Sequence, residues 1–307
     1  MENQCVGLAE AMGLTPVVKR VRLRFPWKQL SPTILRIGNC WSLAAGSDPI
    51  APPWPDVLIA TGRHSVSSSL AVRAANPTTF RIQIQDPAVR PSLFDLVVVP
   101  RHDRLRGDNV MVTKGALHRV TPAVTAAAAQ RFAAAAGALP RPLAAVLVGG
   151  DNGAYRMSEA VATELAARLV ALSESGAGLL VTPSRRTGAA NEAILRRALE
   201  GRPALVWDGT GENPYFAYLG LADVIVATPD SVSMVSEACS TGKPVFIAEL
   251  PGGSRKFDAF HQGLRADGIT HPFTGRLESW VYPPLDDTAQ VAAEAWRRIG
   301  AQIGGRP

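Results

Sequence analysis

Apolar and polar positions repeat one arrangement along the chain: a short apolar run, a polar turn, then a longer periodic or alanine-rich segment. Short runs bounded by turn residues are typical of buried parallel strands, and the longer segments of helices. In the first half, this pattern predicts strands at residues 17–23, 56–60, 79–84, 94–99 and 109–112. It predicts helices at residues 5–12, 32–37, 66–75 and 121–136.

The pattern starts again after a glycine- and proline-containing linker at residues 137–142. Strands are predicted at residues 144–148, 179–182, 204–207, 224–227 and 245–248. Helices are predicted at residues 158–174, 191–200, 215–220, 232–241, 257–265 and 286–303. Two such halves predict an α/β protein with two doubly wound, Rossmann-like domains that face a cleft. Such domains usually open with a strand, which is not found here. Either this domain begins with a helix, or the first strand of the N-terminal domain is missing from this sequence.

Composition favours a small phosphorylated ligand over nucleic acid. The 307 residues are 47% hydrophobic and carry a net charge of +6 without a dense basic run. Cys5, Cys40 and Cys239 are scattered, so neither a disulfide framework nor a zinc site is predicted. No apolar run reaches the ~18 residues that span a bilayer. We expect a cytoplasmic protein, with the inner face of the membrane as an alternative location.

Residues 221–250 form the most informative stretch of the chain. A β-branched run ends in Thr228-Pro229-Asp230-Ser231, and a helix follows. This turn places hydroxyls, a carboxylate and free backbone N–H groups at a helix N-terminus, where anions bind well. Glu237 lies about a turn and a half inside that helix. Every doubly wound domain contains such a unit, however, so a purely structural role stays open.

Three further polar turns follow strands of the second half. Glycines leave room for a ligand beside the backbone, and arginine pairs with phosphate oxygens in a bidentate way. The alternative is that the two arginines are solvated charges of a loop. Four polar turns at one sheet edge, however, favour ligand binding. The predicted donor-binding residues are Gly150, Asn152, Ser184, Arg185, Arg186, Asn213, Thr228, Asp230, Ser231, Ser233 and Glu237.

Other nucleotide-binding classes fit less well. The turn after the strand at 144–148 is not GxGxxG, and the next strand ends without the acidic residue that binds the NAD ribose, although Arg185 leaves NADP open. Neither a Walker signature nor a GxSxG nucleophile elbow is present. In the first half, His102, Asp103 and His118 follow predicted strands and are candidate general bases. A lone histidine is more often structural.

Ordered motifs along nearly the whole chain resemble the family of plant mitochondrial fission Elm-type proteins and their bacterial relatives. Members of that family normally begin with a strand and a glycine-rich turn, which this sequence lacks. The motifs are Gln83-Ile84-Gln85-Asp86-Pro87, Pro100-x-His102-Asp103, Val112-Thr113-x-Gly115-Ala116-x-His118, Pro183-Ser184-Arg185-Arg186-Thr187, Asn213-Pro214-Tyr215, Thr228-x-Asp230-Ser231-x-Ser233-Met234-x-x-Glu237 and Thr241-Gly242-Lys243-Pro244-Val245.

Residues 221–250 are also similar to the donor-binding segment of GT-B glycosyltransferases. This resemblance implies an acceptor-side domain at 1–137 and a nucleotide-sugar-binding domain at 143–285, with Glu237 near the ribose. It also implies a terminal helix at 286–307 that crosses back to the first domain. Bacterial members of the Elm-type family are generally regarded as candidate glycosyltransferases, whereas plant members recruit fission machinery.

Two functions are therefore predicted. The first is a metal-independent glycosyltransferase that moves a sugar from a nucleoside-diphosphate donor to a cell-envelope acceptor and needs no cofactor. Arg185, Arg186 and the helix N-terminus at Ser231 would stabilise the leaving diphosphate, with Asp103, His118 or His102 as base. The alternative is a non-catalytic GT-B-fold adaptor that recruits a protein partner, at a membrane for example.

Overall fold

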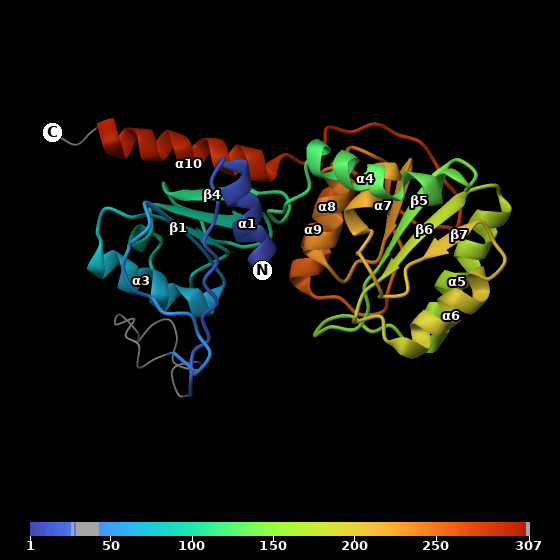
Figure 1. Ribbon diagram of the computed structural model, residues 1–307, viewed down its shortest axis with the longest axis horizontal. Helices are drawn as coiled ribbons and strands as arrows, with labels where there is room; N and C mark the ends of the chain where they lie inside the picture. Colours follow the sequence, from blue (N-terminus) through green and yellow to red (C-terminus); the bar gives the residue numbers. More distant parts are fainter. Residues whose placement is uncertain (26–27, 29–42, 305–307) are drawn as a thin grey trace. The chain divides into compact units, whose positions relative to one another are not determined.

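The computed structural model describes residues 1–25, 28 and 43–304 (Figure 1). These residues form two compact units, Met1–Arg119 with Asp286–Pro307, and Val120–Leu285. Helix α4 (Pro122–Gly137) belongs to the second unit, where it packs against α7 (Tyr215–Leu221). The boundary thus lies before this helix, whereas the sequence analysis placed it after. The helix predicted at 32–37 lies outside the described residues.

The first unit contains a parallel four-stranded sheet in the order β1-β2-β3-β4. Its helices pack on both faces. The strands are β1 (Val57–Thr61), β2 (Phe80–Ile84), β3 (Leu96–Pro100) and β4 (Val110–Thr113), the α-helices are α1 (Glu2–Ala11), α3 (Val66–Ala75) and α10 (Asp287–Gly304), and single 3-10 turns are η2 (Arg63–Ser65) and η3 (Pro91–Leu93).

Residue alternation along the strands explains why both faces of this sheet are covered. Ile82 of β2 packs in one apolar cluster with Leu8 of α1 and Val291 of α10. Val97 of β3 packs in another with Val66 of α3. Since successive side chains point to opposite faces of a strand, strands that are apolar at nearly every position need helices on both sides.

The strand predicted at 17–23 is wrong. Among the described residues, this segment forms only one isolated antiparallel bridge, between Leu23 and Leu43. Val17 is 84% exposed, and Val18 is exposed as well. The apolar–polar alternation of this segment would suit a strand, but a strand also needs a neighbouring ladder, and a short periodic run cannot show whether one is available.

The second unit contains a parallel six-stranded sheet in the order β10-β9-β8-β5-β6-β7. Strand β10 was not predicted, because three residues are too few to give a hydrophobic pattern. The strands are β5 (Leu143–Val148), β6 (Gly178–Pro183), β7 (Ala204–Val206), β8 (Val224–Ala227), β9 (Val245–Ile247) and β10 (Thr270–Pro272).

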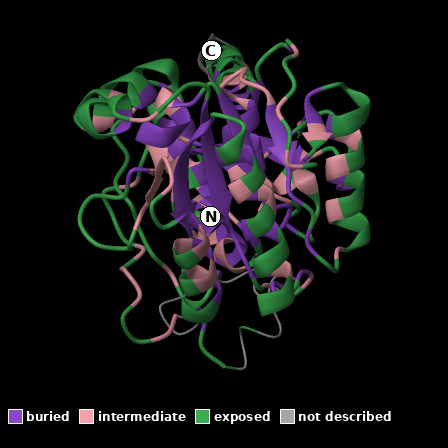
Figure 2. Cartoon of the chain, turned by 90° about the vertical axis from the view of Figure 1, so that its right-hand side faces the viewer, coloured by how far each residue is buried: buried purple, intermediate pink, exposed green. Residues whose placement is uncertain are grey.

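Helices cover both faces of this sheet and bury its central strands, which Figure 2 shows between helices with exposed outer faces. All six residues of β5 are buried. Ala145 lies in a cluster with α4, α7, α8 (Val232–Cys239) and α9 (Arg255–Ala266), whereas Val146 lies in a cluster with α5 (Glu159–Glu174) and α6 (Ala189–Leu199).

The strand order of the second unit fixes where a ligand can bind. Counted from β5, the order across the sheet is 3-2-1-4-5-6, so the winding reverses between β5 and β8. Chain segments leave these two strands toward opposite faces, and ligands of open α/β sheets bind at the carboxyl ends of the strands at such a point. The residues after Val148 and after Ala227 are therefore the candidates for a site.

Candidate functional site

Two turns are joined by hydrogen bonds at the point where the winding reverses. The N–H of Gly149, after β5, donates to Thr228 Oγ1 at 2.8 Å. The N–H of Gly150 donates to Asp230 Oδ2 at 3.0 Å, and Asn152 Nδ2 donates to Asp230 O at 2.7 Å. Residues about eighty positions apart in sequence thus form one edge, as the sequence predicted.

Asp230 is the centre of this network. Its side chain is fully buried and accepts a hydrogen bond from Thr228 Oγ1 at 2.6 Å. It also forms an ion pair with Arg186 at 2.7 Å, and the Arg186 side chain is 41% exposed. An ionised carboxylate can remain buried only when it is paired and hydrogen-bonded. Asp230 therefore ties the turns together through protein contacts, which is a different role from the ligand contact that we predicted for it.

Close packing within the protein itself requires glycine at positions 149 and 150, whether or not a ligand binds there. A Cβ at Gly149 would overlap the Asp230 carboxylate. A Cβ at Gly150 would overlap the backbone carbonyl of Arg186. The absence of a side chain at both positions lets the turns after β5, β6 and β8 approach one another.

The turn after β6 presents one free cation. Thr187 Oγ1 donates to the carbonyl oxygens of Val148 and Gly149, which holds this turn against the end of β5. Arg186 N donates to Ser184 Oγ at 3.2 Å. Arg185 is exposed and makes no hydrogen bond or ion pair within the described part of the chain. Of the two predicted phosphate-binding arginines, Arg185 is the one whose guanidinium is not already engaged.

Helix α8 begins at this edge with a complete N-cap. Ser231 Oγ accepts a hydrogen bond from the N–H of Met234 at 3.3 Å. The N–H groups of the first turn have no partner inside a helix, and the helix dipole adds partial positive charge there. Ser233 lies in this first turn and is partly buried. The arrangement suits an anion.

Glu237 lies further along α8 and meets a tyrosine that we did not predict. Tyr215 Oη donates to Glu237 Oε2 at 2.6 Å. Glu237 is 9% exposed, and its burial raises its pKa to about 7. Burial likewise raises the pKa of Tyr215. Asn213 Oδ1 accepts from the N–H of Tyr215 at 3.0 Å, so the predicted Asn213 supports the start of α7.

His261 of α9 is a second residue that the sequence analysis missed. Its Nε2 lies 2.8 Å from Pro229 O, in the turn before α8. Its ring stacks on Phe257, and burial lowers its pKa. Nothing in the spacing of residues 229 and 261 indicates this contact, because the chain passes through α8 and β9 in between.

The three predicted base candidates lie in the first unit, after adjacent strands. His102 and Asp103 follow β3, and His118 follows β4. Asp103 and His118 are buried, at 8% and 5% exposure. The His118 N–H donates to Thr288 Oγ1 of α10 at 3.1 Å. The loop that carries His118 is thereby fixed by the terminal helix.

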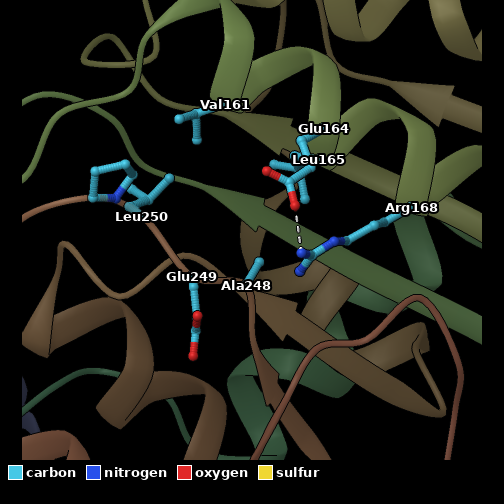
Figure 3. A pocket seen from close by; sticks show the side chains of 8 residues that line it. Val161, Glu164, Leu165, Arg168, Ala248, Glu249 and Leu250 are labelled. Carbon is cyan, nitrogen blue, oxygen red and sulfur yellow. Dashed lines mark hydrogen bonds and ion pairs between the residues drawn. The ribbon is translucent and has the colours of Figure 1, made fainter.

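A separate pocket of about 280 Å³ lies beside α5 (Figure 3). Glu164 and Arg168 form an ion pair of 2.6 Å along one wall. No residue of the predicted donor-binding set lines this pocket. Its walls are Val161, Glu164, Leu165, Arg168, Ala248, Glu249, Leu250 and Pro251.

Within residues 1–25, 28 and 43–304, no group of three His, Cys, Asp or Glu side chains is placed to hold a metal ion. In the same part of the chain, no helix combines the length and apolar character that crossing a membrane requires.

A family model described as "Mitochondrial fission ELM1" matches residues 1–299. The chain belongs to the mitochondrial fission ELM1 family. It is 33% identical to the mitochondrial fission protein ELM1 of Arabidopsis thaliana, a match that covers 81% of this chain and 65% of that protein. It is 25% identical to the uncharacterized protein RP120 of Rickettsia prowazekii (strain Madrid E), over 78% of each chain. The chain thus spans about two thirds of the length of its plant ELM1 relative.

The fold of this ELM1-family chain is similar to that of a solved epimerase. The UDP-GlcNAc 2-epimerase of Methanocaldococcus jannaschii, in complex with UDP-GlcNAc and UDP, matches with a TM-score of 0.50. The identity is 11%, and the match covers 81% of this chain and 76% of that one. Together with the two parallel sheets, this likeness confirms the predicted GT-B-like α/β fold class.

Proposed function

We propose that this chain binds a nucleoside-diphosphate sugar at the β5–β8 edge of the second unit and transfers the sugar to a cell-envelope acceptor without a metal ion. The observation that supports this most is that three groups belong to segments that begin or end at that edge. They are the uncommitted guanidinium of Arg185, the capped N-terminus of α8 and the carboxylate of Glu237. The structurally similar epimerase was crystallised with a ligand of this class.

In this proposal, the chain's own groups replace a metal ion. Arg185 and the first-turn N–H groups of α8 bind the diphosphate and stabilise the negative charge that develops as the sugar–oxygen bond breaks. Arg186 acts mainly through Asp230, whose carboxylate it neutralises. Glu237 accepts hydrogen bonds from the ribose hydroxyls. Asp103, His118 and His102 are the candidates for the base that takes the acceptor proton.

A calorimetric titration with UDP, GDP, ADP and CMP tests the donor site. We expect at least one nucleotide to bind, and Arg185→Ala to weaken it about tenfold or more, since a hydrogen bond to a charged group contributes ~1.5–3 kcal/mol. Arg197→Ala is the matched control, because Arg197 is exposed on α6 away from the turns. Absence of binding by all four nucleotides would contradict the proposal.

The alternative function is a non-catalytic adaptor, and membership of a family named for mitochondrial fission favours it. It predicts a stoichiometric protein partner together with an empty donor site. A pull-down analysed beside the titration distinguishes the two functions.

The proposal locates the protein in the cytoplasm, with peripheral contact to the inner face of the membrane. Co-sedimentation with anionic vesicles tests that contact, and recovery of all protein in the supernatant would count against it.

A further inference from the structure

Tyr215 and Glu237 meet because of the winding of the second unit. Helix α7 starts after the loop that follows β7, and α8 starts after the turn that follows β8. Both helices begin at the carboxyl edge of the sheet and cover the same face of it. Tyr215 is the first residue of α7, and its hydroxyl reaches Glu237 Oε2 at 2.6 Å.

The hydrogen bonds of the carboxylate leave one oxygen available. A carboxylate only accepts hydrogen bonds, so Tyr215 is the donor and uses its single hydroxyl proton on Oε2. Glu237 Oε1 makes no hydrogen bond within the described part of the chain. Glu237 is 9% exposed, and its Oε1 is not among the buried atoms that lack a partner, so this oxygen is accessible to a ligand. A hydroxyl group of a ligand would donate the missing hydrogen bond to Oε1.

We propose that Tyr215 is a positioning residue for ribose recognition: it fixes the Glu237 carboxylate so that Oε1 accepts a hydrogen bond from the nucleotide's ribose. This inference rests on the proposed donor site and adds to it a preference for ribonucleotides over nucleotides without ribose hydroxyls. A buried polar group that is left unpaired by the wrong ligand gives strong discrimination.

A merely structural role of Tyr215 makes a different prediction. Tyr215 also packs edge-on against Phe216, with ring centroids 5.7 Å apart. If the hydroxyl only stabilised this packing, its removal would weaken every nucleotide equally. The positioning role predicts a loss that depends on the ribose hydroxyls.

The test compares UDP, GDP, ADP and CMP with their 2′,3′-dideoxy counterparts on the full chain, at about pH 8, above the pKa of about 7 of Glu237. For the nucleotide that binds, we expect the wild type to favour the ribose form by about tenfold. Tyr215→Phe should reduce this preference to about twofold or less and leave affinity for the dideoxy form unchanged. Tyr218→Phe, which removes a hydroxyl from the same helix, should keep the full preference.

A second variant keeps the test decisive if Tyr215→Phe folds poorly. Glu237→Gln should also abolish the preference, and adding Tyr215→Phe to it should change the preference no further. An unchanged preference in Tyr215→Phe, or an equal loss for both ligand forms, overturns the role of Tyr215 alone. Absence of binding by all four ribonucleotides to the wild type overturns the donor site itself and this inference with it.

Discussion

The buried carboxylate of Asp230 lies 2.7 Å from the half-exposed guanidinium of Arg186, and the same oxygen accepts the N–H of Gly150 at 3.0 Å. One side chain thus joins the turns that follow β5, β6 and β8. These turns carry the proposed diphosphate contacts. Both the stability of the site and its ability to bind a nucleotide should therefore depend on Asp230.

Asp230→Asn should lower the free energy of unfolding by about 2–3 kcal/mol. The amide cannot accept hydrogen bonds in the pattern of the carboxylate, so Gly150 N–H or the Thr228 hydroxyl loses a partner in a buried place. Urea unfolding measures the change. Asp208→Asn, at an exposed turn of the same unit, is the control and should stay within about 0.5 kcal/mol. Equal effects for both variants would contradict the central role of Asp230.

Gly149→Ala should destabilise the protein by about 1–3 kcal/mol and abolish nucleotide binding, because the added methyl group would overlap the Asp230 carboxylate. Thermal unfolding and the nucleotide titration give the two measurements. Gly153→Ala is a matched control in the same loop, since its Cβ would meet nothing within 4 Å. The prediction fails if the two alanine variants behave alike.

Ser231→Ala should cost about 1 kcal/mol of stability, since the first turn of α8 loses its cap to Met234 N–H. Ser233→Ala removes a hydroxyl from the same turn without removing the cap. It should therefore leave stability within about 0.5 kcal/mol and change nucleotide affinity only. Chemical unfolding of both variants, followed by titration, separates capping from binding.

Glu237 should make the protein less stable as the pH rises. Burial raises its pKa to about 7, whereas an unfolded glutamate titrates near ~4.3. The folded state therefore holds the proton more tightly, and the stabilisation is complete below pH ~4.3 and lost as the pH rises through about 7. Glu237→Gln cannot titrate, so its stability relative to the wild type should increase across this range. Parallel stability–pH curves for the two proteins would show that Glu237 is not protonated there.

Most helices and strands could be predicted, since long periodic segments and buried apolar runs such as 144–148 show their hydrophobic pattern within the segment itself. The failures have local causes. Residues 17–23 alternate like a strand but join no ladder within the described part of the chain, and β10 is too short to show a pattern. The N-terminal boundary of the second unit was misplaced because the contact of α4 with α7 depends on packing between helices far apart in sequence.

The polar turns of the proposed site could be grouped from sequence, but their contacts could be predicted only in part. Strand ends of a parallel sheet share one edge, so turn residues such as Arg185 and Ser231 could be grouped from sequence. The different contacts of Arg185 and Arg186 could not be predicted, because the two arginines look alike in the sequence. Only Arg186 reaches a buried carboxylate.

The sequence by itself determined the α/β alternation, the family and the set of polar turns, because these depend on hydrophobic period and on residues that are close in the chain. Only the tertiary structure decided that Asp230 binds the protein itself, that Gly149 is needed for close packing, and that Tyr215 and His261 contact Glu237 and Pro229. These contacts depend on distances across the sheet and between helices, which the packing of the whole unit sets.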